Sequence, residues 1–398
     1  MKKSMLFVID SLHCAGAEKS LISLLSLIDY SVYDVDLQLF GYGGVLENLI
    51  PNKVNLLKPL GYTQFTEMSL KQALLHSIKN FKFKFLISRL KYSSKIRKEK
   101  YNHSQLARIF WENVRNSIEN NSKIYNIAIS YAQGIPTFYV AEKINASKKF
   151  AWVNTSYNLF EEDKTFQSIY YDKYDKIIAV SDSAKELFEN DFPCYREKIK
   201  VIYDINNYDL IYRMSLIGDS YNDDYNGLRI LTIGRLSKEK GYEIAIEACK
   251  ILKEKGVKFK WYVLGQGILK EEIERKIKVN ELEDDFILLG VKSNPYSYIK
   301  DCDIYVQTSA FEGFGLAIAE ARMLNKPVVT TRFDAVYSQM IHEKNGLVVD
   351  MNSSSVAYGI QRLIEDKKLN QSIVGYLEKE KKGNIEELEK FYELIERS

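Results

Sequence analysis

Two glutamates separated by seven residues form the pattern with the clearest chemical potential. Glu312 and Glu320 lie in the segment SAFEGFGLAIAEA, between an apolar run at residues 304–307 and another at 327–331. These runs predict parallel strands, and the loop after such a strand lies at the carboxyl edge of the sheet, where ligands bind. Both carboxylates could accept hydrogen bonds from sugar or ribose hydroxyls. The structural alternative is a helix cap and a solvated acid.

Glycines and an expected helix start indicate that the same segment could bind an anion. Gly313 and Gly315 let the backbone approach a ligand closely. A helix is expected to begin near Gly315 or Leu316. Its free N–H groups and its positive dipole end suit a phosphate.

A second pattern brings cations to the same edge of the predicted sheet. Gly234, Arg235 and Lys240 lie in the loop IGRLSKEKG, which closes an apolar run. Such cations can neutralise a diphosphate and stabilise it as it departs. The alternative is a surface loop in which only Gly234 and Gly241 matter.

Two shorter patterns end at this edge as well. Gly265 begins a Gly-x-Gly pattern after residues 258–264, and Val291 and Pro295 follow residues 286–289. Val291 and Pro295 are candidates to frame a nucleotide base. A single Gly-x-Gly identifies no ligand on its own.

A polar loop follows the first expected strand, residues 5–9. It reads DSLHCAGAE, and its Gly16 could let the chain pass close to a phosphate. The dinucleotide pattern Gly-x-Gly-x-x-Gly is absent here, so bound NAD is not expected. His13 is either a further polar contact or a solvated side chain.

Short apolar runs alternate with helical patterns along the chain. The runs are residues 5–9, 35–40, 126–130, 150–153 and 176–180, then 229–234, 258–264, 286–289, 304–307, 327–331 and 347–349. This alternation predicts an α/β protein with two doubly wound parallel sheets. The polar, turn-rich stretch 206–227 is the expected break between them.

Residues 69–121 depart from this rhythm and have helical periodicity with little strand character. From Lys71 to Lys100, ten lysines and arginines stand against one acid, Glu99, and aromatic residues interleave with the charges. Two interpretations stay open. The helices lie on an anionic membrane surface, or they form a solvated face whose apolar stripe packs on the amino-terminal domain.

Composition restricts the class of protein. The 398 residues carry a net charge of +3, too small to indicate a nucleic-acid partner. The spacing of the four cysteines predicts reduced thiols in the cytoplasm and no metal site; they are Cys14, Cys194, Cys249 and Cys302. The apolar run after Met1 is too short for a signal peptide, and no run reaches the length of a membrane-spanning helix.

On these residues the chain resembles glycosyltransferase family 4, the retaining enzymes of GT-B fold. The Glu-x(7)-Glu motif inside Ser-x-x-Glu-Gly-Phe-Gly carries the resemblance, and Gly234–Gly241, Gly265–Gly267 and Asn294–Tyr296 fall in the family's order. The resemblance implies two Rossmann-like lobes with an interlobe cleft.

The same resemblance implies the division of the chain. An acceptor-side domain would cover residues 1–207, with the basic helical segment 69–121 inside it. A nucleotide-sugar-binding domain would cover 208–383. The last helix, 384–398, would pack back onto the first domain.

For the site, the resemblance implies that Arg235 and Lys240 bind the donor diphosphate, while Glu312 holds the donor sugar. These three would be the catalytic residues. Glu320 would bind the ribose. The remaining donor-binding positions would be Gly16, Gly234, Gly265, Val291, Pro295 and the amides of Gly313, Phe314, Gly315 and Leu316. The nucleotide sugar is the donor substrate, and no metal or other cofactor is expected.

The implied function is transfer of a hexose or an N-acetylhexosamine, with retention, to a saccharide or polyprenyl-linked saccharide of a bacterial surface polysaccharide. UDP is the expected nucleotide, and the expected location is the cytoplasm, including the inner face of the membrane. Two positions depart from the family: Ala15 replaces a glycine, which is a mild change, and Asn154 replaces the histidine of Trp-x-His. Asn154 and the basic helical segment keep an alternative open. Asn cannot take a proton at neutral pH. The alternative is a non-catalytic GT-B partner of another glycosyltransferase.

Overall fold

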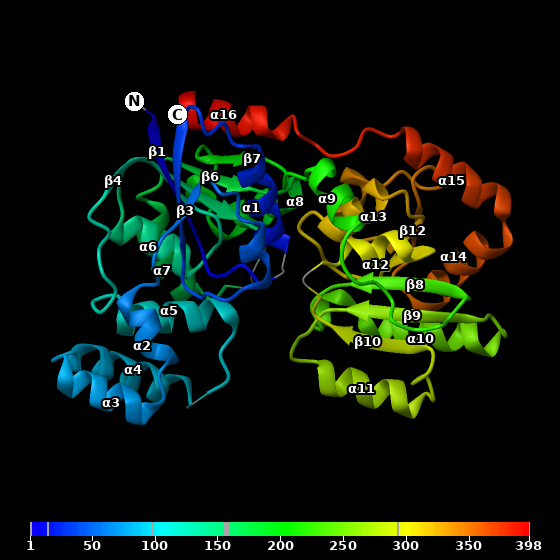
Figure 1. Ribbon diagram of the computed structural model, residues 1–398, viewed down its shortest axis with the longest axis horizontal. Helices are drawn as coiled ribbons and strands as arrows, with labels where there is room; N and C mark the ends of the chain where they lie inside the picture. Colours follow the sequence, from blue (N-terminus) through cyan, green and yellow to red (C-terminus); the bar gives the residue numbers. More distant parts are fainter. Residues whose placement is uncertain (1, 14–15, 98, 155–158, 293, 398) are drawn as a thin grey trace. The chain divides into compact units, whose positions relative to one another are not determined.

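The computed structural model describes residues 2–13, 16–97, 99–154, 159–292 and 294–397. Cys14, Ala15 and Lys98 of the preceding predictions lie outside this part of the chain. The chain forms two compact units (Figure 1). The first runs to Tyr203 and takes in the residues from Glu386 onward, and the second is Asp204–Ile385. These limits differ by a few residues from the expected boundaries at 207 and 384.

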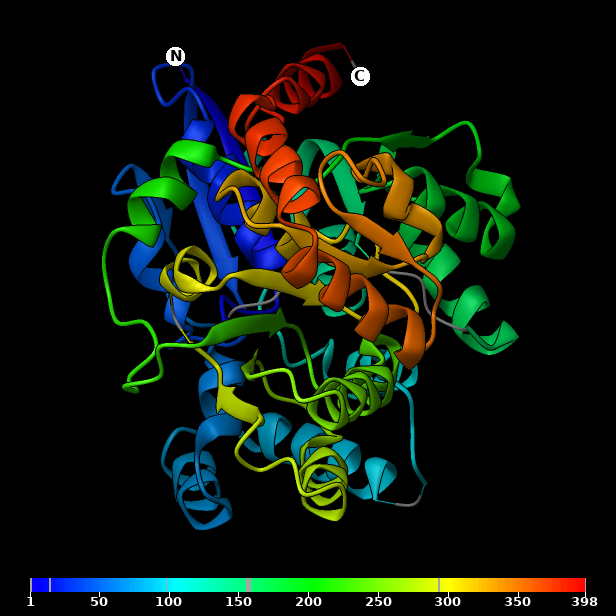
Figure 2. The same cartoon turned by 90° about the vertical axis from the view of Figure 1, so that its right-hand side faces the viewer.

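The first unit is built on a parallel sheet in the order β3-β2-β1-β4-β5-β6-β7. The strands are β1 (Lys3–Ile9), β2 (Tyr33–Leu39), β3 (Val54–Leu56), β4 (Ile124–Ser130), β5 (Asn145–Val153), β6 (Lys176–Ala179) and β7 (Ile199–Val201). In the central strand β1, five consecutive apolar residues from Met5 to Ile9 are buried. A strand buried on both faces needs such a run, because helices cover the two sides of a parallel sheet (Figure 1, Figure 2).

The helices of the first unit include two 3-10 turns, Val45–Leu49 and Pro193–Tyr195. The α-helices are α1 (Gly16–Leu27), α2 (Gly61–Glu67), α3 (Leu70–Lys79), α4 (Phe83–Ile96), α5 (His103–Val114), α6 (Ile135–Lys143), α7 (Glu161–Tyr171), α8 (Asp182–Asp191) and α16 (Glu387–Arg397). The C-terminal helix α16 joins the core of this unit through Phe391, whose ring lies 6.4 Å from that of Phe7 and 6.1 Å from that of Trp152.

The second unit has a parallel sheet in the order β10-β9-β8-β11-β12-β13. Its strands are β8 (Leu228–Ile233), β9 (Phe259–Leu264), β10 (Phe286–Gly290), β11 (Ile304–Gln307), β12 (Val328–Thr331) and β13 (Leu347–Val349). Its α-helices are α9 (Tyr208–Ser215), α10 (Tyr242–Glu254), α11 (Lys270–Val279), α12 (Tyr296–Asp301), α13 (Leu316–Met323), α14 (Ser353–Glu365) and α15 (Lys367–Lys379). Two 3-10 turns, Lys238–Lys240 and Asp334–Ser338, complete it.

The predicted α/β class with two doubly wound sheets is confirmed, and each predicted strand is present. The sequence patterns missed β3 and β7, which have three residues each and form the two edges of the first sheet. The expected break at 206–227 also contains α9. Only three of its eight residues are polar or charged, and its apolar side buries Ile211 in the core of the second unit. The turn-rich residues on either side of it concealed this short helical segment.

None of the helices in the described part of the chain combines the length and the apolar character needed to traverse a bilayer.

Close backbone packing joins the loops at the carboxyl edge of the second sheet. Gly241 has φ 63°, and a Cβ there would lie 2.1 Å from the carbonyl oxygen of Thr308. The hydroxyl of Thr308 donates in turn to the carbonyl of Lys240 at 3.0 Å, and Ala310 N–H donates to Glu239 O at 2.8 Å. The loops after β8 and β11 are thereby held together.

Gly241→Ala should destabilise the second unit more than Gly256→Ala does. Both glycines have positive φ, 63° and 73°, but a Cβ at Gly256 meets nothing within 4 Å. Gly256→Ala should therefore lower the free energy of unfolding only by the cost of a left-handed backbone for alanine, about 1–2 kcal/mol. Gly241→Ala adds a clash with backbone, and thermal unfolding of both variants measures the difference. Equal melting temperatures would contradict the proposed loop contact.

The first unit keeps a carboxyl group in a desolvated position at the end of β1. Asp10 follows Ile9 directly, and its carbonyl oxygen accepts the N–H groups of Phe40 and Gly41 at 3.0 and 2.7 Å. Burial, and secondarily the carboxylate of Glu18, raises the pKa of Asp10 from 3.8 to about 7. Because the folded-state pKa is the higher one, the stability linked to this group is complete below about pH 4 and is lost as pH rises toward 7.

Asp10→Asn should therefore raise the melting temperature at pH 8 and change it much less at pH 4. Asparagine has nearly the same shape and carries no charge, so it avoids the burial of a carboxylate at the higher pH. Asp34→Asn, at an exposed position of β2, is the matched control. A shift for Asp10→Asn that is the same at both pH values would show that charge burial is not the cause.

Candidate functional site

An ion pair between Lys240 and Glu312 is the centre of the candidate site. Lys240 ends the 3-10 turn after β8, and Glu312 lies in the loop after β11, the neighbouring strand. The Lys240 Nζ lies 2.6 Å from both carboxylate oxygens of Glu312. The two side chains are 19% and 12% exposed, so the pair is sheltered and still reachable from solvent. The structure thus brings together the cation and the acid that the two motifs predicted.

Two further side chains fix the carboxylate of Glu312. Ser309 Oγ donates to Oε1 at 2.6 Å, and Gln307 Nε2 donates to the same oxygen at 3.0 Å. With Lys240, Oε1 has three donors, whereas Oε2 has the Lys240 contact alone among the hydrogen bonds of the described residues. A carboxylate oxygen offers about two acceptor sites. Oε2 is therefore the oxygen of Glu312 with capacity for a further donor.

The helix that follows presents its amino-terminal end in the same loop. Gly315 precedes α13 with φ 83° and provides no side-chain cap. The side-chain amide of Gln339 fixes this loop by donating to the backbone carbonyls of Phe314 and Gly315. The first N–H groups of a helix have no partner within it, and the dipole adds a partial positive charge. The predicted helix start near Gly315 or Leu316 is confirmed, and this end suits an anion.

Glu320 forms a second, separate pair deeper in the unit. It is buried on α13 at 1% exposure, and the hydroxyl of Tyr296 on α12 donates to its Oε1 at 3.1 Å. The contact fixes the orientation of the carboxyl group. A buried acid held in this way is not the solvated acid of the structural alternative.

Arg235 occupies an exposed position directly after Gly234. No carboxylate among the described residues lies within ion-pair distance of its guanidinium. Gly234 lies at the carboxyl end of β8. Its N–H donates to Leu264 O at 3.0 Å, and its carbonyl accepts the Tyr242 hydroxyl at 2.8 Å. Arg235 is thus a cation available to an incoming anion.

The remaining predicted positions of this unit differ in accessibility. Gly265 has φ 149°, and a Cβ there would lie 1.9 Å from Gly234 O, so packing between loops explains this glycine without a ligand. Val291 is 40% exposed after β10. Pro295 is buried at the start of α12. Of the two candidates to frame a base, Val291 is therefore the open one.

The predicted residues of the first unit lie at the ends of its central strands. Gly16 begins α1 and is exposed, as is His13. Asn154, after β5, donates through Nδ2 to Tyr131 O at 2.8 Å. Its Oδ1 is buried and has no hydrogen-bond partner among the described residues. Asn154 is therefore held as a fixed acceptor rather than as a proton carrier.

The sequence patterns assigned no role to three residues that hold the site, although Ser309 and Tyr296 lie within the motifs. Gln307 and Ser309 position Glu312, and Tyr296 positions Glu320. The one available signal was a polar residue at the end of an apolar strand, at Gln307, because such a side chain needs a partner when buried. Tyr296 pairs with a residue 24 positions away, which no local pattern reveals.

Part of the chain matches a known protein family. Residues 220–380, within the second unit, match the family described as "Glycosyl transferases group 1". The chain is 30% identical over 212 residues to an N-acetylgalactosamine-N,N'-diacetylbacillosaminyl-diphospho-undecaprenol 4-alpha-N-acetylgalactosaminyltransferase of Campylobacter jejuni, covering 53% of this chain and 56% of that protein. It is 26% identical over 205 residues to the capsular polysaccharide biosynthesis glycosyltransferase CapM of Staphylococcus aureus, covering 50% and 54%. It thus spans about half the length of these curated relatives.

Solved structures resemble the chain over nearly its whole length. A mutant of S. aureus TarM in complex with fondaparinux, α-GlcNAc-glycerol and UDP has a TM-score of 0.67 at 16% identity, with 99% of this chain and 100% of that one covered. Anabaena HepE in complex with UDP and glucose has a TM-score of 0.64 at 19% identity, with 94% and 93% covered. At these identities the likeness shows the fold. The chain has the GT-B fold, and residues 220–380 of its second unit match the model of the group 1 glycosyltransferases.

Proposed function

We propose that this chain is a retaining glycosyltransferase that moves a hexose or an N-acetylhexosamine from a UDP-sugar to a saccharide or lipid-linked saccharide. Its product would belong to a bacterial surface polysaccharide, and it would act in the cytoplasm. The observation that carries the proposal is the Lys240–Glu312 pair, which joins the loop after β8 to the loop that leads into α13. These two adjoining loops offer a cation, an acid for the sugar and a helix end without a side-chain cap.

Three positive groups are proposed to receive the donor diphosphate. Arg235 is exposed, Lys240 is partly exposed, and the amino-terminal end of α13 contributes its N–H groups. As the bond from the sugar to the phosphate breaks, negative charge grows on the departing UDP. Fixed cations and helix dipoles stabilise such charge without reorganising, which is the main source of rate acceleration in sites of this kind.

The two glutamates are proposed to bind the neutral parts of the donor. Oε2 of Glu312 has the spare acceptor capacity described above and would accept a sugar hydroxyl. Glu320, oriented by Tyr296, would accept the ribose hydroxyls. Hydrogen bonds to charged acceptors are stronger than those between neutral groups, so each contact supports donor binding.

The proposed chemistry keeps the anomeric configuration. The acceptor oxygen attacks the anomeric carbon on the face from which UDP leaves, the bond from carbon to phosphate oxygen breaks, and the phosphate takes both the electron pair and the acceptor proton. The proton therefore needs no side-chain base. Asn154, which cannot accept a proton, is compatible with this route.

The comparisons support the same assignment. The Campylobacter relative is named for transfer of N-acetylgalactosamine to a diphospho-undecaprenol substrate, and CapM for capsular polysaccharide biosynthesis. TarM and HepE were solved with UDP. These names support UDP as the nucleotide and a saccharide or lipid-linked saccharide as the acceptor.

A UDP-sugar should raise the melting temperature of the wild-type chain, and Arg235→Gln should weaken this effect. Saturation at about 100 times Kd contributes about 2.7 kcal/mol, or roughly 5 °C for a domain of this size. Loss of one phosphate-binding cation should weaken binding about tenfold, equal to about 1.4 kcal/mol. A thermal-shift series with UDP, GDP, UDP-hexoses, UDP-N-acetylhexosamines and GDP-mannose measures both effects.

Lys238→Gln is the matched control for this experiment, because Lys238 is an exposed cation three residues further along the same loop and should leave the shift unchanged. If no nucleotide stabilises the wild-type chain, the proposed donor site is wrong. If Arg235→Gln and Lys238→Gln behave alike, the role assigned to Arg235 is wrong.

Glu312→Gln should reduce sugar transfer at least tenfold while the chain stays folded. The amide can still accept a hydrogen bond, but it loses the charge and places an NH₂ where Oε1 or Oε2 now accepts. Transfer is measured with the UDP-sugar that gives the largest thermal shift and with acceptor saccharides, and NMR of the new linkage reports the anomer. An inverted product would overturn the proposed mechanism, and undiminished transfer would overturn the role of Glu312.

A further inference from the structure

Helices α3 and α4 expose their large apolar side chains and bury their small ones. Eight aliphatic and aromatic residues from this pair are between 46% and 86% exposed: Leu70, Leu74, Leu75, Ile78, Phe81, Phe83, Ile87 and Leu90. The residues that α3 and α4 bury are Ala73, Ser77 and Ser88. A helix of a soluble domain usually has the opposite arrangement, with its large apolar residues toward the core.

The exposed residues fall on continuous faces. On α4, Phe83, Ile87 and Leu90 have the spacing i, i+4, i+7, which places them on one side of the helix. On α3, Leu74 and Ile78 are likewise four residues apart. The two helices pack on each other. They form the lower end of the first unit in Figure 1, beyond α5 and away from the sheet.

The turn between the two helices presents an aromatic ring to solvent. Phe81 is 86% exposed, the highest value among the large apolar residues described in the first unit, and its φ is 54°. A bulky residue rarely adopts this left-handed conformation. Such backbone strain persists only when the surrounding structure imposes it, and it is concentrated at functional positions.

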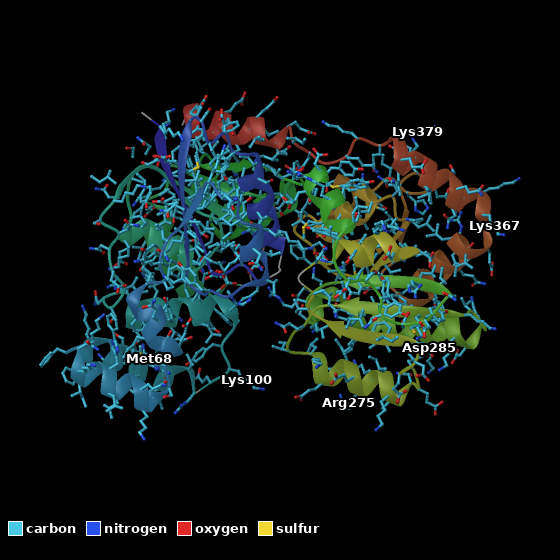
Figure 3. All side chains as sticks on the ribbon, viewed as in Figure 1. Met68, Lys100, Arg275, Asp285, Lys367 and Lys379 are labelled. Carbon is cyan, nitrogen blue, oxygen red and sulfur yellow. The ribbon has the colours of Figure 1, made fainter. Side chains whose placement is uncertain are left out.

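Positive charge surrounds this apolar surface. No aspartate or glutamate occurs between Glu67 and Glu99, an interval whose nine cations are Lys71, Lys79, Lys82, Lys84, Arg89, Lys91, Lys95, Arg97 and Lys98. Within the described residues, Lys95 is the member of this set that lies within 4.0 Å of a carboxylate, at 3.9 Å from Glu112. Figure 3 shows the side chains that extend from this end of the unit, between the labelled Met68 and Lys100.

The core-facing side of α4 anchors this helix, and α3 packed on it, to the rest of the unit. Ser88 Oγ lies 2.9 Å from Ser117 Oγ, and Arg89 donates to the carbonyls of Phe65 and Met68 at 3.3 and 2.8 Å. The ring of Phe85 packs against Tyr62 and Phe65, with centroids 5.4 and 5.6 Å apart. The exposed side is therefore the outer face of a folded element.

We propose that this surface, the outer face of α3, the Phe81 turn and α4, docks on an anionic lipid bilayer. Aliphatic and aromatic side chains beside lysines match the boundary between headgroups and acyl chains, because the apolar groups enter it while the ammonium groups reach the phosphates. Anionic lipids attract nearby lysines and arginines. The inference stands on this surface alone and does not depend on the proposed sugar transfer.

Other occupants fit these observations less well. A second copy of the same face would bring like charges together without acids to pair with them. A nucleic acid would contact the cations but would leave the aliphatic side chains of α3 exposed to water. The absence of acids and the presence of leucine and isoleucine together favour the lipid surface.

Vesicle co-sedimentation of the full chain tests the proposal. We expect binding to vesicles of phosphatidylcholine with 30–40% phosphatidylglycerol, roughly tenfold or more above binding to phosphatidylcholine alone at low salt. Binding should fall as salt rises from about 0.05 to 0.5 M, because screening shortens the range of the attraction.

Two sets of substitutions separate charge from apolar contact. The charge variant is Lys71→Gln, Lys79→Gln, Lys84→Gln and Lys91→Gln, and the apolar variant is Phe81→Gln and Ile87→Gln. Each should lower vesicle binding at least fivefold. All six positions are exposed, so the fold should be retained, which circular dichroism and the melting temperature check.

Matched controls come from exposed residues of the second unit. Lys270→Gln, Lys278→Gln, Lys367→Gln and Lys368→Gln remove the same charge, and Ile268→Gln with Val279→Gln removes apolar residues that are 93% and 76% exposed. These controls should bind vesicles as the wild type does.

Three results would overturn the proposal: no binding to anionic vesicles at low salt, equal losses in the test and control variants, or binding that the apolar variant leaves unchanged. The first would direct the search to an acidic protein partner. The nucleotide-induced thermal shift is measured on the same variants and should stay intact, so failure of membrane docking and failure of the proposed function give different results.

Discussion

The second unit depends on the contact between the loops after β8 and β11. Lys240 and Glu312 come from these two loops, and their ion pair lies beside the place where Gly241 lets the backbone approach Thr308 closely. Ser309 and Gln307 donate to Oε1 of Glu312, which leaves acceptor capacity on Oε2. The site thus combines close backbone packing between two loops with an ion pair between their side chains.

A pair of this kind is better explained by function than by stability. Removing two charges from water costs free energy that their attraction often only offsets. Lys240 and Glu312 are largely sheltered but remain partly exposed, so the cost is moderate and both groups stay within reach of a donor. The same reasoning applies to Glu320, whose burial is tolerated because Tyr296 supplies a hydrogen bond.

The two units share one type of sheet but differ in where they place their polar and apolar groups. The second unit gathers its polar groups at the carboxyl edge, where helix starts and loops meet, as parallel sheets generally do. The first unit instead exposes large apolar side chains on its surface. There the helices α3 and α4 keep serines and Ala73 inside and leave leucine, isoleucine and phenylalanine outside. At the end of β1, desolvation raises the pKa of the Asp10 carboxyl, which is expected to make folding pH-dependent.

The sequence by itself determined the class of fold and the segments that carry the site. Apolar runs identified every long strand, because a strand buried on both faces must be apolar throughout, and the spacing of Glu312 and Glu320 located the helix α13. It also reported the basic, aromatic composition of residues 69–121. Only the tertiary structure decided which side of those helices is exposed, because periodicity marks a face without telling what covers it. Likewise, Tyr296 and Thr308 come from other elements than their partners Glu320 and Lys240, and the direction of a side chain across such a contact depends on backbone angles that no local pattern specifies.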